Sequence, residues 1–255
     1  MNTTESKYVE KKSYLARLAH PRELAVREDA RHLEAEFGSE AEWLRTVKED
    51  LPKFIPFLRA SGLEFRGRVL EIGAGAAWLS AELSKLPKVV EVVATDFSPK
   101  LLKEKAPKIF KMLQAHEGKI TRMPADFHKL DFPDNYFDFV VCSAVLHHAV
   151  SPGMVLREAK RVLKPGGKLA AIREPVWPLM KLKSRSRGGA KSKLRDPKRP
   201  LHTLAEYREL FDRAGFALEV KRVNLAGGLR YYFDKLVNGL THARYAFIAT
   251  KKSRS

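Results

Sequence analysis

Two glycines and an acid form the most informative chemical pattern in this sequence. Gly73 and Gly75 lie in EIGAGAAW, residues 71–78, and Asp96 follows Gly75 by 21 residues. Glycines let a backbone turn tightly and come close to a ligand, because no Cβ atom intervenes. An acid at the end of the next strand suits hydrogen bonds to the 2′- and 3′-hydroxyls of a ribose. The pattern predicts a cofactor that contains a ribose, although two such glycines would also suit the plain packing of a strand against a helix.

Candidate proton acceptors follow two later apolar segments. His147 and His148 come after the run at 137–145, and Glu174 ends the run at 168–174. A histidine can take up a proton near pH 7, and a carboxylate can do the same or orient an acceptor. The alternative for the histidines is that one of them packs beneath the cofactor and binds only backbone atoms.

No metal site is predicted from the sequence. The chain has a single cysteine, Cys142, which excludes an intramolecular disulfide and a cysteine-based zinc cluster. Cys142 ends an apolar run and is interpreted as a small buried hydrophobic residue. His147 and His148 are adjacent in the chain, so their rings are expected to point in different directions.

Alternating strand-like and helix-like segments would hold these residues at one edge of a sheet. Thr203, with Glu206 three residues later, is predicted to cap one of the helices. Such alternation is typical of βαβ units and of a parallel sheet covered on both faces. The expected fold class is therefore α/β and Rossmann-like, with helices on both faces. The predicted strands are 68–73, 91–96, 119–126, 137–145, 168–174, 216–223 and 244–250.

The chain is predicted to have a helical N-terminal segment and one larger domain. Residues 1–60 are expected to form a helical lid, and residues 61–255 the cofactor-binding domain. Ser39, with Glu42 three residues later, is placed to cap a helix of the lid.

Positive charge is concentrated in one insertion of the larger domain. The 255 residues include 48 lysines and arginines and 30 acids, a formal net charge of +18. Residues 181–199 hold nine basic residues and one acid, within an irregular insertion at about 176–202. Because it follows the strand that ends at Glu174, this insertion is expected beside the molecule on which the cofactor would act. It could bind an anionic small molecule, nucleic acid or an anionic membrane surface, or it could be a solvated loop.

No segment of the sequence indicates export or a membrane span. The N-terminus is polar and lacks the apolar stretch of a secretory signal. No run approaches the roughly 18 apolar residues that a membrane helix needs. The expected location is the cytoplasm, and the sequence gives no indication of the oligomeric state.

Four segments together resemble the motifs of one enzyme family. They are VLEIGAGAA (69–77), ATDFSPKLL (94–102), ADFHKLDFPDNYFDFVVCSAVLHH (125–148) and LREAKRVLKPGGKLAAIREP (156–175). In these segments the chain resembles the class I S-adenosyl-L-methionine (SAM)-dependent methyltransferases, in the branch of methyltransferase type 11 and the ubiquinone/menaquinone methyltransferase-like enzymes. The resemblance implies SAM as cofactor, S-adenosyl-L-homocysteine as product, and a seven-stranded, mostly parallel sheet whose last strand is antiparallel.

The resemblance implies that four residues surround the methionine part of SAM. Glu71, Gly73 and Gly75 would line it, and Ser143 would face it through its backbone. The residues themselves also disfavour a dinucleotide cofactor, because Trp78 stands where such enzymes place a third glycine and Glu71 would repel a phosphate. Neither argument applies to a cofactor that carries a cationic sulfonium group.

Four further residues are implied for the adenosine part of SAM. Asp96 would hold the ribose hydroxyls and Phe97 would pack on the adenine ring. Asp126 would accept a hydrogen bond from the adenine amino group, with Phe127 beside it. The alternatives are a solvated strand end for Asp96, a helix cap for Asp126 and plain core positions for the two phenylalanines.

The expected reaction is methyl transfer from SAM to an oxygen or nitrogen nucleophile of a small molecule. It is an in-line displacement, and because the sulfonium is already an activated leaving group, positioning is expected to supply most of the catalysis. One alternative is an RNA methyltransferase that uses residues 181–199. Another is a catalytically silent protein of the same fold that binds a partner.

Overall fold

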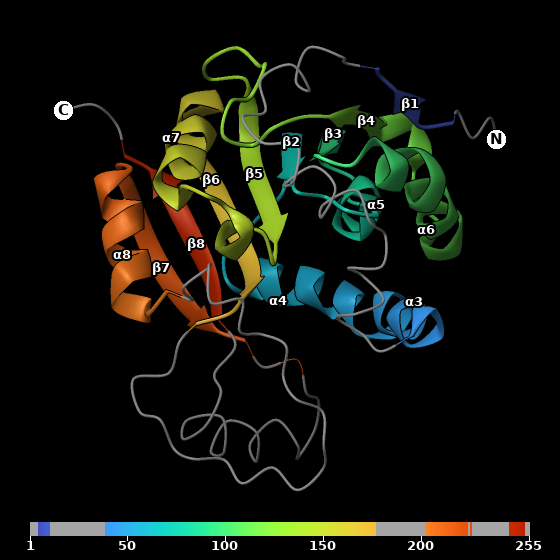
Figure 1. Ribbon diagram of the computed structural model, residues 1–255, viewed down its shortest axis with the longest axis horizontal. Helices are drawn as coiled ribbons and strands as arrows, with labels where there is room; N and C mark the ends of the chain where they lie inside the picture. Colours follow the sequence, from blue (N-terminus) through green and yellow to red (C-terminus); the bar gives the residue numbers. More distant parts are fainter. Residues whose placement is uncertain (1–4, 11–38, 177–201, 224, 226–244, 253–255) are drawn as a thin grey trace, which may run out of the picture.

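The computed structural model describes residues 5–10, 39–176, 202–223, 225 and 245–252. An eight-stranded sheet runs through the molecule in the order β1-β4-β3-β2-β5-β6-β8-β7 (Figure 1). Neighbouring strands are parallel except β8, which is antiparallel to β6 and β7. The predicted α/β sheet with an antiparallel last strand is therefore confirmed. The strands are β1 (Lys7–Tyr8), β2 (Gly67–Ile72), β3 (Val89–Asp96), β4 (Ile120–Pro124), β5 (Phe137–Ser143), β6 (Leu163–Glu174), β7 (Phe216–Arg222) and β8 (Tyr245–Lys251).

The eighth strand comes from the N-terminal segment, where the sequence predicted helices. In β1, Tyr8 is paired with Arg122 of β4. The Val9 N–H donates to the Arg122 carbonyl at 2.9 Å, and the Arg122 guanidinium donates to the Ser6 carbonyl at 3.0 Å. The prediction of seven strands was thus one strand short, and residues 5–10 are extended rather than helical. The partners are up to 116 residues apart, so no local pattern could indicate the pairing.

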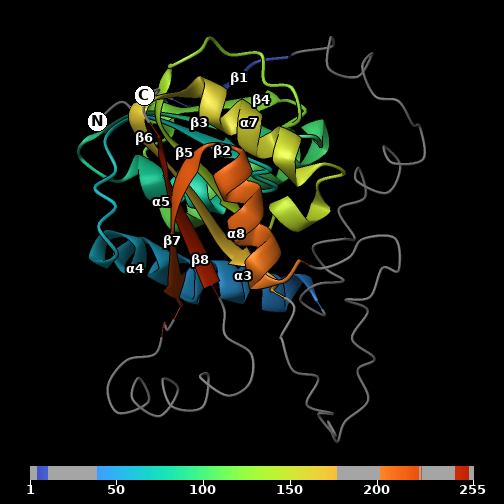
Figure 2. The ribbon, with the colours of Figure 1, turned by 90° about the vertical axis from the view of Figure 1, so that its left-hand side faces the viewer.

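Helices cover both faces of the sheet, as predicted (Figures 1 and 2). Helices α3 to α6 contribute to the core on one face, and α7 and α8 to the core on the other. The helices are α3 (Glu40–Glu49), α4 (Phe54–Ala60), α5 (Trp78–Ser84), α6 (Ala106–Leu113), α7 (Pro152–Val162) and α8 (Leu204–Arg213). Four short helical turns are η2 (Leu51–Lys53), η3 (Leu101–Lys105), η4 (Glu117–Lys119) and η5 (Leu146–His148).

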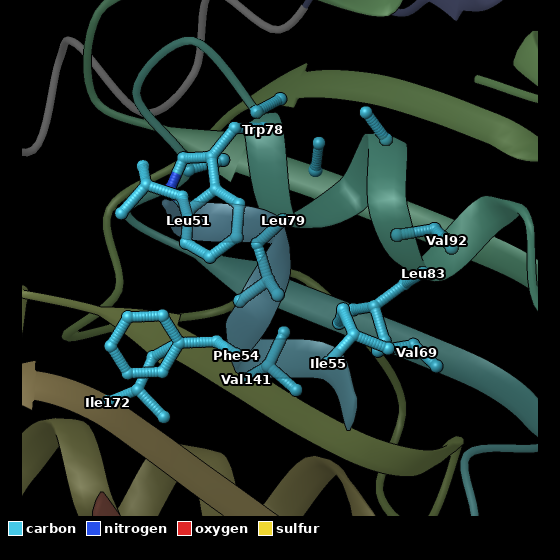
Figure 3. Close-up of a cluster of buried hydrophobic side chains, with 14 of the residues drawn as sticks. Leu51, Phe54, Ile55, Val69, Trp78, Leu79, Leu83, Val92, Val141 and Ile172 are labelled. Atoms are coloured by element: carbon cyan, nitrogen blue, oxygen red, sulfur yellow. The ribbon is translucent and has the colours of Figure 1, made fainter. Parts of the chain in front are cut away.

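Strict alternation along the central strands divides the apolar side chains between the two cores. In β5, Val141 packs with α3 to α6, whereas Val140 and Cys142 pack with α7 and α8. Full burial of one side chain such as Val or Leu contributes roughly 1.5–3 kcal/mol to the stability of the folded protein. Figure 3 shows the first core, in which Leu79 and Leu83 of α5 lie between the sheet and α4. This packing holds α5, and the turn that precedes it, firmly against the sheet.

Two helix starts that the sequence predicted are confirmed. Ser39 caps α3, where its hydroxyl accepts a hydrogen bond from the Glu42 N–H at 3.2 Å. Thr203 and Glu206 form a complete capping box at α8, each side chain accepting from the backbone of the other residue. Each such cap is worth about 1 kcal/mol.

The described part of the predicted lid packs into the main core. Trp43 of α3 and Phe54 of α4 are buried in the same cluster as α5 and the sheet. Residues 40–60 therefore form part of the helix layer on that face. The rest of the predicted helices, at 11–38, and the basic residues at 177–201 lie outside the described residues.

Candidate cofactor and acceptor site

The parallel strands bring their carboxyl ends to one edge of the sheet. The five central strands all run in the same direction. The predicted site residues either end these strands or follow them directly. This edge is where α/β sheets bind their ligands. From β2 to β6 the last strand residues are Ile72, Asp96, Pro124, Ser143 and Glu174.

The turn after β2 contains three residues in the left-handed conformation. The φ angles are +63° at Gly73, +55° at Gly75 and +57° at Ala77. The Ala74 N–H donates to the Thr95 carbonyl at 2.8 Å and so ties the turn to β3. Glycine adopts this conformation without strain, whereas an alanine pays roughly 1–2 kcal/mol. Ala77 is therefore a strained start for α5.

Gly73 and Gly75 differ in what surrounds them, which predicts different effects of adding a methyl group. A Cβ atom on Gly73 would lie 2.6 Å from Cγ2 of Val145, whereas nothing lies within 4 Å of a Cβ on Gly75. We expect Gly73→Ala to lower the free energy of unfolding by about 3 kcal/mol, from the strained φ and the clash together. Gly75→Ala carries only the strain and should lose about 1 kcal/mol. Urea unfolding of both variants measures the difference, and equal losses would contradict the close packing at Gly73.

Asp96 joins the glycine turn to the end of β3. One carboxylate oxygen accepts from the Gly75 N–H at 2.7 Å, and the other accepts from the Ser98 N–H at 2.8 Å. A carboxylate has about four acceptor positions, so these two bonds are compatible with further bonds to ribose hydroxyls. The two bonds also fix the orientation of the carboxylate before any ligand arrives.

Glu71 lies buried beneath the same turn and binds the start of α5. One of its carboxylate oxygens accepts from the Ser80 N–H at 2.8 Å and from the Ser80 hydroxyl. Burial raises the pKa of Glu71 from 4.5 to about 8, although the two bonds from Ser80 oppose the shift. The sequence predicted that Glu71 lines the methionine part of the cofactor, but it did not indicate this link to Ser80.

The residues predicted for the adenine lie in the segments that follow β3 and β4. Phe97 and Phe127 are both buried. Asp126 accepts from the His128 backbone N–H and pairs with the His128 imidazole Nδ1, both at 2.9 Å. The Ser151 N–H, at the start of α7, approaches the other ring nitrogen of His128 at 3.4 Å. His128 was not predicted as a site residue, and its position two residues after the acid was the available signal.

Ser143 ends β5 and lies beside a distorted part of β6. Its hydroxyl is 3.4 Å from the Arg173 guanidinium. Ala144 and Arg173 both have positive φ, +58° and +60°. Because such angles strain non-glycine residues, the surrounding contacts must hold these two in place.

Glu174 is buried under η5 and binds His147. Its side chain is fully buried, while that of His147 is 16% exposed. One carboxylate oxygen accepts from the N–H groups of Val145 and Leu146 at 2.8 and 2.9 Å. The other pairs with the His147 imidazole Nδ1 at 2.9 Å. The His148 ring lies next to it, with the two ring centroids 3.9 Å apart.

Two further buried groups, the thiol of Cys142 and the hydroxyl of Tyr207, lie near Glu174. Cys142 is a buried free thiol, and burial, with the charges of Glu174 and Glu71, raises its pKa. The hydroxyl of Tyr207 on α8 is buried and has no hydrogen-bond partner among the described atoms. Burial and the nearby Glu174 raise the pKa of Tyr207 as well. Both groups therefore stay protonated near neutral pH.

The described residues contain neither a candidate metal cluster nor a helix suited to span a membrane. No cluster of three or more His, Cys, Asp or Glu side chains in the described ranges could hold a metal ion. In the same part of the chain, no helix is both long and apolar enough to cross a membrane.

Residues 70–171 match the family model described as "Methyltransferase domain". The ubiquinone/menaquinone biosynthesis C-methyltransferase UbiE of Proteus mirabilis is 32% identical over 179 residues, which are 68% of this chain and 65% of that protein. The chain thus spans less than two thirds of this curated relative's length. The glycine turn, Asp96, Asp126 and the two histidines after β5 all lie within the residues 70–171 that match the family model.

Two solved structures have a similar fold. An S-adenosylmethionine-dependent methyltransferase from Mesorhizobium loti has a TM-score of 0.60 and 22% identity, over 78% of this chain and 98% of that chain. The cyclase SpnF has a TM-score of 0.56 and 19% identity, over 79% of this chain and 81% of that chain. At such identities the likeness establishes the fold alone. The two names also indicate that one fold carries different reactions.

Proposed function

We propose that this chain transfers a methyl group from SAM to a small molecule and releases S-adenosyl-L-homocysteine, because residues 70–171 match the methyltransferase domain model and the fold is similar to that of a SAM-dependent methyltransferase. One observation carries the proposal furthest. The carboxylate of Asp96 is fixed at 2.7 Å from the Gly75 N–H, at the carboxyl edge of the sheet. A ribose held by Asp96 would lie against an open glycine turn, since nothing lies within 4 Å of the Cβ position of Gly75.

The other predicted cofactor residues fit the same arrangement. In the proposal, Gly73 and the backbone of Ser143 border the methionine part of SAM. Phe97 and Asp126 border the adenine, and the His128 imidazole at 2.9 Å holds the Asp126 carboxylate in place. SAM supplies an activated methyl group when bound. The residues of this chain orient the reactants and exclude water. Orientation of the reactants is the main requirement of an in-line displacement.

The acceptor is proposed to be a small molecule with an oxygen or nitrogen nucleophile. The curated relative's name describes a C-methyltransferase, so a carbon nucleophile is an alternative that the product analysis must distinguish. The predicted roles of residues 181–199 toward an anionic acceptor, RNA or a membrane remain predictions, because these residues lie outside the described part of the chain.

Labelled SAM tests the proposal directly. The purified protein is incubated with SAM that carries a radiolabelled methyl group and with a cell extract separated into small molecules, lipids, RNA and protein. We expect label in the small-molecule fraction, and mass spectrometry of the labelled product identifies the methylated atom. Label in the RNA fraction, lost when residues 181–199 are deleted, would instead support the RNA alternative.

The second candidate is a catalytically silent protein of the same fold that binds a partner. This candidate predicts SAM binding by calorimetry with no label transferred to any fraction. Absence of SAM binding to the wild-type protein would contradict both candidates.

A further inference from the structure

We propose that His147 is the general base of this reaction and that buried Glu174 is its positioning residue, so the acceptor is one that must lose a proton as it is methylated. This inference rests on the proposed function and specifies the substrate class of the same site. An acceptor hydroxyl, or another neutral group whose proton is retained at working pH, fits this requirement. An acceptor that is already deprotonated does not need such a base.

Four interactions fix the Glu174 carboxylate. Three backbone N–H groups point at it, from Val145 at 2.8 Å, Leu146 at 2.9 Å and His147 at 3.3 Å. The fourth partner is Nδ1 of the His147 ring at 2.9 Å. Three of these four partners are backbone groups, so the carboxylate stabilises the start of η5. The fourth bond orients the His147 ring.

The bond to Glu174 determines where the proton of His147 lies. Burial alone would raise the pKa of Glu174, but the bonds from His147 and the backbone N–H groups outweigh it and lower the pKa. An ionised carboxylate only accepts hydrogen bonds, so Nδ1 must carry a proton, and in the neutral imidazole Nε2 then has the lone pair. Nε2 has no hydrogen-bond partner among the described residues.

The segment that carries His147 lies next to the cofactor turn. Val145, two residues before His147, fills the space that Gly73 leaves open. The charges of Glu71 on β2 and Glu174 on β6 both act on Cys142 of β5 between them. His147 therefore stands at the carboxyl edge directly beside the turn where SAM is proposed to bind.

The titratable groups around His147 come from several elements. His148 lies on the same turn at a ring distance of 3.9 Å. Glu174 is on β6, with Cys142 on β5 and Tyr207 on α8 close to it. Cys142 and Tyr207 stay neutral near pH 7, so Glu174 is the main charge that stabilises an imidazolium at His147.

The proposed step balances without a further reactant. The acceptor atom forms a bond to the methyl carbon while the carbon–sulfur bond of the sulfonium breaks, and sulfur keeps that electron pair. The acceptor proton moves to Nε2 of His147, where the imidazolium is stabilised by Glu174, and then to water. The products are the methylated acceptor, S-adenosyl-L-homocysteine and one proton.

The first experiment measures methyl transfer by His147 variants. The probe is labelled SAM together with the extract fraction that the wild-type protein labels. We expect His147→Asn to lower the rate about 100-fold or more, with a smaller loss at high pH, where the acceptor loses its proton unaided. Its SAM affinity by calorimetry should stay within about 3-fold of wild type, because the proposed SAM contacts remain. The control His116→Asn, an exposed histidine before η4, should keep the wild-type rate.

Glu174→Gln tests the positioning role. An amide oxygen can still accept from the backbone of η5, so folding is expected to be retained, and a melting curve checks this. The rate should fall roughly 10- to 100-fold, as for other residues that orient a functional histidine.

Nitrogen-15 NMR of the imidazoles gives a readout that needs no acceptor. We expect the His147 signal of the wild-type protein to show the proton on Nδ1 near pH 8. A proton on Nε2, or a His147→Asn variant with the wild-type rate, overturns this proposal while methyl transfer itself stands. Failure of the wild-type protein to bind SAM overturns the proposed function, and the NMR signal then still decides whether Glu174 orients His147.

Discussion

Asp96→Ala is expected to weaken SAM binding by about 100-fold or more. Hydrogen bonds to a charged group contribute about 1.5–3 kcal/mol each, and two bonds to ribose hydroxyls would be lost. The variant also removes the partners of the Gly75 and Ser98 N–H groups, which are held at 2.7 and 2.8 Å. The glycine turn would therefore become less ordered at the place where the cofactor is proposed to lie. Calorimetric titration with SAM measures the effect.

Two variants separate this loss from a general effect of removing an acid. Asp212→Ala removes a surface carboxylate of α8 that pairs with Lys252, and it should leave SAM affinity unchanged. Asp96→Asn keeps an acceptor oxygen but loses the charge, and we expect an intermediate loss of about 10-fold. If Asp96→Ala binds SAM as tightly as wild type, the assignment of the ribose to Asp96 is wrong.

Glu71→Gln is expected to change how the stability of the protein depends on pH. Glu71 has a pKa of about 8 in the folded protein and 4.5 without its surroundings. Below pH 4.5 both states hold the proton. As the pH rises from 4.5 to 8, the unfolded state releases it and the folded state retains it, so stability declines. Relative to the variant, the wild-type protein should lose about 3 kcal/mol of unfolding free energy between pH 6 and pH 9.

Urea unfolding of the two proteins at several pH values gives this difference curve. The matched control is Glu219→Gln on β7. There the hydrogen bond and the charge of Lys221 lower the pKa of an exposed carboxyl, so Glu219 is ionised in both states from pH 6 to pH 9. This control should leave the pH dependence as it is in wild type. Parallel curves for wild type and Glu71→Gln would mean that Glu71 is ionised in the folded protein.

The structure suggests why one edge of the sheet can combine cofactor binding with acid–base chemistry. Glu71 and Glu174 are both buried at this edge, but their partners differ. Glu71 binds Ser80 and its pKa rises, whereas Glu174 binds three N–H groups and His147 and its pKa falls. Two like residues thereby adopt opposite protonation states near neutral pH, which is a recurrent feature of functional sites.

The sequence by itself determined the elements that depend on nearby residues. The strands and most helices follow from the alternation of apolar residues and from caps such as Ser39 with Glu42, three positions apart. The glycine turn and the acid at the end of β3 were recognisable for the same reason, because a tight turn and a strand end are local features.

Only the tertiary structure decided which partner each polar group would have. β1 pairs with a strand more than a hundred residues later in the chain, and Glu174 reaches back 27 residues to the ring of His147. The sequence placed Glu174 correctly at a strand end but could not show that its carboxylate would be buried under η5. Burial and hydrogen bonding, which fix protonation states, arise only when distant segments pack together. Spacing along the chain therefore indicated the cofactor turn, while the roles of Glu71 and Glu174 required the packed structure.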